Sequence, residues 1–101
     1  MMNVKTIIIS PYTFRIEIVI SPMKDGAGND LDGQIHYDDP RIQLDAKLAD
    51  VPARIVLFHE CLHAIGEVTG QKLNEGQINA LAYGLVRFAR DNPEFWGLLA
   101  Q

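Results

Sequence analysis

An apolar run over residues 51–68 contains the pentapeptide His59-Glu60-Cys61-Leu62-His63. The run has the length and composition of a buried helix, and the residues between and beside the histidines are otherwise uncharged. Two histidines four positions apart on a helix have Cβ atoms roughly 5–6 Å apart. Their rings can therefore converge on one ion about 2.0–2.1 Å from each nitrogen. Glu60 lies beside the first histidine, where its carboxylate can act as a general base on a metal-bound water.

Length and composition limit the other possibilities. A chain of 101 residues predicts a single domain over residues 1–101. The nine Lys and Arg residues are scattered and the net charge is −4, so no nucleic-acid partner is expected. Cys61 is the only cysteine, which excludes an intramolecular disulfide. No uncharged apolar run approaches the ~20 residues of a membrane span, so we expect a cytoplasmic protein with no membrane partner. The oligomeric state stays open.

Strand patterns occupy the first half of the chain. Residues 4–9 are β-branched and apolar, and residues 12–20 alternate with the period of a half-buried strand. Residues 23–32 have the composition of a loop. Two short strands are predicted at residues 34–37 and 41–45, around a turn at Asp38-Asp39-Pro40.

Helix signals occupy the second half. Asp50 is the predicted N-cap of a first helix that ends near Gly70, and Asn74 with Gln77 forms a capping-box pair for a second helix over residues 75–90. Asn92 and Pro93 start a short helix through residue 99. Core-facing positions of the first helix are predicted at Ile55, Phe58, Leu62 and Ile65/Gly66, with Cys61 as a small core residue. The fold class is α+β, with a small, mostly antiparallel sheet packed on the motif helix and the second helix.

A zinc site with an open position needs a third protein ligand. Glu67 lies one turn past His63, but three successive turns of one straight helix do not easily surround an ion. His36 is in the strand region and has the character of a surface strand residue. Glu75 begins the second helix, which follows the first after a short connection, so it can approach the two histidines. We expect Glu75 to be the third ligand.

Two further residues share a face of the second helix with Glu75. Tyr83 lies two turns after Glu75 and is a candidate hydrogen-bond donor to the developing oxyanion. Asn79 lies between them and is expected to orient a ligand or to bond the backbone of the first helix.

The segment from Glu75 to Ala82 resembles the helix that follows the His-Glu-x-x-His motif in ImmA/IrrE-like metallopeptidases. Residues 41–45 before the motif helix are also similar to that family and to short phage- or prophage-encoded gluzincins. The resemblance covers residues 32–94, although Gly76 and Ile78 replace more usual residues. It implies a minimal zincin-like domain, His59, His63 and Glu75 as metal ligands, and Glu60 as catalytic base.

The expected activity is hydrolysis of peptide bonds by a zinc-dependent peptidase acting on a peptide or protein substrate. The alternative is a non-catalytic zinc-binding protein that binds peptides or regulates a host or prophage factor. Ile42 and Leu44 are predicted to face the core while Arg41 and Gln43 face outward. In proteins that resemble this one, a sheet edge beside the zinc binds the substrate, so we expect residues 41–45 to be that edge. We therefore expect a broad, weak preference for substrate side chains, with an apolar residue favoured next to the cleaved bond.

Overall fold

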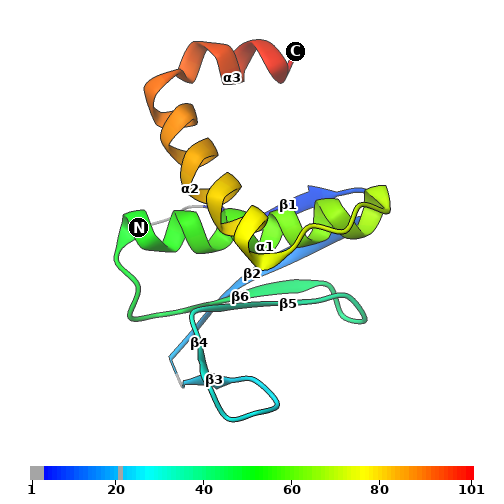
Figure 1. Ribbon diagram of the computed structural model, residues 1–101, viewed down its shortest axis with the longest axis vertical. Coiled ribbons are helices and arrows are strands. Elements are labelled where there is room, and N and C mark those ends of the chain that lie inside the picture. The colour runs from blue at the N-terminus through cyan, green and yellow to red at the C-terminus, as the bar shows by residue number, and fades with distance from the viewer. Residues whose placement is uncertain (1–3, 21) are drawn as a thin grey trace.

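A four-stranded sheet carries a long helix on one face (Figure 1). The computed structural model describes residues 4–20 and 22–101. The helices are α1 (Asp50–Thr69), α2 (Glu75–Asp91) and α3 (Pro93–Leu99). The strands are β1 (Thr6–Ile9), β2 (Tyr12–Val19), β3 (Met23–Lys24), β4 (Asp30–Leu31), β5 (Gly33–His36) and β6 (Arg41–Asp45). The predicted α+β class is confirmed.

The order of strands in the sheet is β1-β2-β6-β5. β1 pairs antiparallel with β2, and β5 pairs antiparallel with β6 across the turn at residues 37–40. β6 lies between β2 and β5, and it runs parallel to β2. Two of the three pairings are antiparallel and one is parallel, so the sheet is mixed. The parallel pairing arises because β6 lies between two earlier strands and runs in the direction set by its hairpin with β5. The edges of the sheet are β1 and β5.

Residues 23–32 are not the plain loop that their composition predicts. Met23–Lys24 and Asp30–Leu31 pair as a two-stranded antiparallel hairpin, β3-β4. The Asp25 carboxylate accepts hydrogen bonds from the backbone N–H groups of Ala27 and Asn29 inside this hairpin. The local turn chemistry thus supports a hairpin that is too short to show a strand pattern in the sequence.

Helix α1 lies between the sheet and α2, and it buries residues toward both. One cluster joins the sheet to α1 and consists of Phe14, Ile42, Leu44, Leu57, Cys61 and Ala64. A second cluster joins α1 to α2 and consists of Leu62, Ile78 and Ala82. The side of α1 that carries Leu62, one of the predicted core-facing positions, thus faces α2. The sheet packs on the side that carries Cys61. Burial raises the pKa of the Cys61 thiol to about 11, consistent with an unreactive core residue.

The ends of the helices follow the predicted signals with two differences. Asp50 is the first residue of α1 rather than its N-cap, which is Ala49. Asn74 and Gln77 form the predicted capping box at the start of α2. Asn92 precedes α3 as predicted, but its side chain makes no capping hydrogen bond to that helix. Its Nδ2 instead donates to the Phe88 carbonyl at the end of α2 (3.0 Å). α2 leads away from the sheet to α3 (Figure 1).

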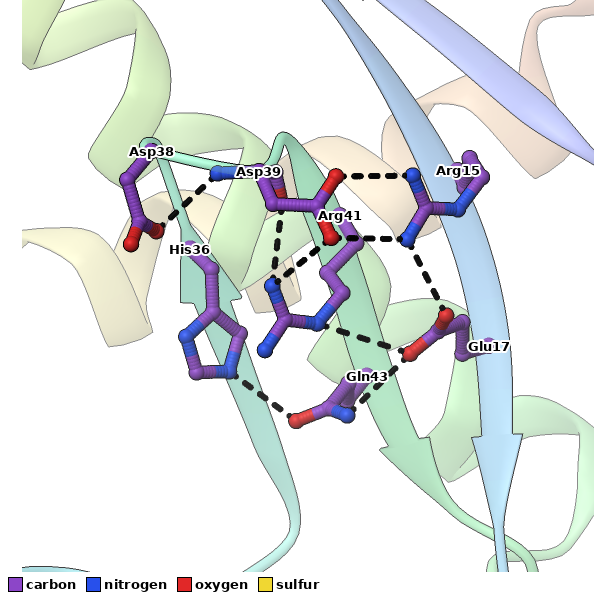
Figure 2. Close-up of polar contacts among 7 residues, drawn as sticks. All are labelled: Arg15, Glu17, His36, Asp38, Asp39, Arg41 and Gln43. Atoms are coloured by element: carbon purple, nitrogen blue, oxygen red, sulfur yellow. Dashed lines mark hydrogen bonds and ion pairs between the residues drawn. The ribbon is translucent and has the colours of Figure 1, made fainter.

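Polar side chains tie three strands together on the face of the sheet opposite α1 (Figure 2). His36 Nε2 is 3.0 Å from Gln43 Oε1, and Gln43 Nε2 donates to Glu17 Oε1 at 3.1 Å. Arg41 Nε lies 3.6 Å from the same Glu17 oxygen. Since these residues come from β5, β6 and β2, the network supports the register of the edge strand.

Candidate metal centre

Three predicted ligands converge where α2 begins beside α1. His59 Nε2 and His63 Nε2 are 3.2 Å apart on one side of α1. The carboxylate of Glu75 reaches both rings, with Oε1 at 2.9 Å from His63 Nε2 and Oε2 at 3.3 Å from His59 Nε2. The ligand atoms of the three residues all lie within 4.8 Å of one another. This group could hold a metal ion, in agreement with the sequence analysis.

The spacing of these atoms fits a tetrahedral ion. Donors at 2.0–2.1 Å from a tetrahedral zinc lie about 3.3–3.4 Å from each other. The two histidine nitrogens are 3.2 Å apart, close to that value, and each lies 2.9–3.3 Å from a different oxygen of the Glu75 carboxylate. Two imidazoles and one carboxylate are also a donor set that zinc accepts. The residues present therefore fit the metal.

The turn between the helices brings Glu75 back toward the histidines. Gly70 ends α1 in the left-handed region, with φ 71°, and the Gln71 N–H donates to the Gly66 carbonyl at 3.0 Å. A side chain at position 66 would place its Cβ 2.9 Å from the Gln71 carbonyl oxygen, so glycine allows this close turn. The capping box then begins α2 at Glu75, directly after the N-cap residue Asn74.

Glu60 lies beside the three candidate metal ligands, His59, His63 and Glu75, but is not one of them. Its nearer oxygen is 4.0 Å from His59 Nε2, farther than either Glu75 contact. The residue is 7% exposed, and it lies against Gly33, where a Cβ would be 3.5 Å from Glu60 Cγ. Burial raises the pKa of Glu60 to about 7, and the nearby Glu75 carboxylate adds to the shift. A buried carboxyl beside a ligand group is the placement that a general base needs.

A hollow of about 560 Å³ opens in front of the ligand group. Helices α1 and α2 contribute His59, Glu60, His63, Glu67 and Glu75. The other wall comes from the β5 edge and its flanks, through Leu31, Gly33, Gln34, Ile35 and Tyr37. Among the described residues, no lysine or arginine lines this hollow. The site is thus an acidic hollow between a helix and a sheet edge.

The structure does not bring the other candidates to the hollow. His36 points to the opposite face of the sheet, where it contacts Gln43 (Figure 2). Tyr83 is 66% exposed, Asn79 is exposed, and neither residue lines the hollow. Tyr83 lies two turns after Glu75 on α2, and α2 leads away from the sheet toward α3 (Figure 1).

Two titratable residues line the hollow that sequence reasoning did not assign a role there. Tyr37 follows β5, and Glu67 lies one turn past His63 on α1. Burial raises the pKa of the Tyr37 phenol, and the carboxylates of Glu67 and Glu60 raise it further. The alternation of Gly33, Ile35 and Tyr37 was the available signal, since these residues share one face of an extended strand.

The edge strand beside the site differs from the predicted one. Ile42 and Leu44 are buried as expected, and Arg41 and Gln43 join the network on the opposite face. However, β6 pairs with β2 on one side and with β5 on the other. Residues 41–45 therefore have no open edge, and the prediction that a substrate pairs with them is wrong. β5 holds the edge position next to the hollow.

Comparisons with known proteins returned no family model, no curated protein and no solved structure that matches this chain. Within residues 4–20 and 22–101, no helix combines the length and the apolar composition needed to cross a membrane.

Proposed function

We propose that this protein is a zinc-dependent peptidase. The observation that carries the proposal is the convergence of His59, His63 and Glu75, with Glu60 beside this group but outside it. A purely structural zinc site closes its fourth position with another protein ligand, whereas a catalytic site keeps that position open. In ImmA/IrrE-like metallopeptidases a His-Glu-x-x-His motif is likewise followed by a glutamate ligand on the next helix. This shared order supports placing the chain among them.

The residues divide the chemistry between them. His59, His63 and Glu75 would hold the metal, which when bound supplies a Lewis acid and an acidified water molecule. Glu60 takes a proton from water at its carboxylate and later delivers that proton to the leaving amine. Its buried position beside Gly33 keeps the carboxyl close to the ligand group and limits competing solvent.

The substrate is proposed to bind as an extended strand along β5. The Asp45 N–H donates to the Asp32 carbonyl at 2.9 Å, directly before β5. Asp32 and Asp45 are therefore a hydrogen-bonded pair of the β5–β6 ladder, and hydrogen-bonded pairs recur at every second residue. By the alternation of an antiparallel ladder, the backbone groups of Gln34 and His36 face β6, and those of Gly33 and Ile35 face the open side. A peptide can pair with Gly33 and Ile35 by strand addition and pass through the hollow.

The test compares the wild type with Glu60→Gln, which is isosteric and removes the base. Protein purified without chelator is assayed for bound metal and for cleavage of a broad peptide library. We expect about one zinc per chain in both proteins and at least a hundredfold lower cleavage in the variant, the usual scale of general-base catalysis. The exposed Glu94→Gln in α3 is the matched control and should behave as the wild type.

Equal cleavage by the wild type and Glu60→Gln would remove the proposed role of Glu60. Zinc binding with no cleavage of any library peptide by the wild type would instead favour the alternative function, a zinc-binding protein that binds peptides or regulates a host or prophage factor.

A further inference from the structure

Glu67 lines the hollow but has no part in the proposed mechanism. It follows His63 by four residues and Glu60 by seven, so the three side chains share the side of α1 that faces β5. Glu67 is exposed, and no ion pair joins it to any residue of 4–20 and 22–101. Its charge is therefore available to a ligand in the hollow.

No basic side chain offsets the charge of Glu67 in the hollow. Among the described residues no lysine or arginine lines it, and the other acidic side chains in its lining are Glu60 and Glu75. A substrate side chain that carries a positive charge is the complement of this surface.

Tyr37 supplies an apolar wall next to that charge. Its ring packs against Tyr12 and Phe14, with centroids 5.3 and 5.9 Å away, which holds its orientation. Tyr37 lines the hollow together with Glu67, whose carboxylate contributes to raising the pKa of the Tyr37 phenol. The methylene stem of a lysine or arginine can lie along an aromatic face while its charged end reaches a carboxylate.

We propose that Tyr37 and Glu67 form a subsite for a lysine or arginine side chain of the peptide substrate. The inference rests on the proposed peptidase function, and it replaces the expectation of an apolar residue beside the cleaved bond. Glu67 is four residues from His63, about 6 Å along the helix axis, which is the length of about two residues of extended chain. The basic residue therefore lies within about two positions of the cleaved bond.

The experiment uses quenched fluorescent peptides that are identical except for Arg, Lys, Ala or Glu at one position near the cleaved bond. For the wild type, we expect kcat/KM for the Arg and Lys peptides to exceed that for the Ala peptide by about fivefold, the upper end for an exposed ion pair. The ratio should fall to about one in Glu67→Gln and favour the Glu peptide in Glu67→Lys. Glu94→Gln should keep the wild-type ratio, and added salt should lower it.

A binding measurement separates this inference from the proposed function. Calorimetry on the zinc-loaded Glu60→Gln protein compares the Arg and Ala peptides, with and without the additional Glu67→Gln change. Tighter binding of the Arg peptide that depends on Glu67 supports the subsite, even if the wild type cleaves nothing and the peptidase proposal fails. Equal binding of the Arg and Ala peptides would overturn the subsite, whatever the cleavage assay shows.

Discussion

A single glycine sets how closely α1 approaches the edge of the sheet. A Cβ at position 33 would lie 2.5 Å from Val56 Cγ1 and 3.4 Å from the Gln43 carbonyl oxygen. Real side chains do not tolerate the first of these distances, so a larger residue must move the Val56 side chain or displace α1 or β5. Because Glu60 lies on the same side of α1, this close packing also determines the depth at which its carboxyl is buried.

Gly33→Ala is expected to lower the free energy of unfolding by about 1–3 kcal/mol, the usual cost of overpacking. Gly84→Ala provides the opposite control. A Cβ there meets no atom within 4 Å, and the position is inside α2, where alanine stabilises a helix by roughly 0.5–1 kcal/mol. Urea denaturation followed by circular dichroism measures both changes. Changes of the same sign in the two variants would contradict the packing argument.

Among the elements, β5 links the sheet to the candidate centre. One of its sides pairs with β6, and its outward residue His36 joins the polar network of Figure 2. Its other side borders the hollow through Gly33 and Ile35. An edge strand held in register on one side presents a fixed row of backbone donors and acceptors on the other.

Strand addition along β5 predicts how backbone changes in a substrate affect cleavage. Methylating one peptide nitrogen at a time, away from the cleaved bond, removes one possible hydrogen bond per peptide. We expect kcat/KM to fall by about two- to tenfold at alternate positions only, since each net hydrogen bond contributes about 0.5–1.5 kcal/mol and successive residues face opposite ways. Losses without a period of two would argue against an extended substrate on this edge.

For the whole molecule, the candidate metal centre lies between α1 and α2, which otherwise share a small core. Only three fully or nearly buried residues, Leu62, Ile78 and Ala82, form the cluster between α1 and α2 among the described residues. α3 has no buried residue, and Phe95, Leu98 and Leu99 are exposed. A metal bound by His59, His63 and Glu75 would therefore add a link between α1 and α2 at the start of α2.

Removal of zinc should lower the melting temperature of the wild type by roughly 10–20 °C relative to protein with zinc at 100 times its Kd. Ligand binding at that excess adds about 2.7 kcal/mol, and each kcal/mol shifts the melting temperature of a domain this size by about 4–8 °C. His63→Ala should show no zinc-dependent shift, while His36→Ala should keep it. Calorimetric melts with and without chelator measure this, and a full zinc response in His63→Ala would exclude the assigned ligands.

The sequence by itself determined the features that depend on near neighbours in the chain. The helical spacing of His59 and His63 and the capping box of Asn74 with Gln77 follow from contacts within one or two turns, and both are present. The short connection between the helices was enough to predict that Glu75 approaches the histidines. The limits of β6 at Arg41 and Asp45 were also correct, because alternation is a local property.

Only the tertiary structure decided which strand is the edge and which residues line the hollow. Strand order depends on pairing between distant segments, so nothing within residues 41–45 shows that β2 and β5 flank them. The direction of α2 likewise depends on how it crosses α1, and this packing leaves Tyr83 in solvent while Tyr37 lines the site. Local periodicity specifies the face of an element on which a side chain lies, but packing between elements specifies what that face meets.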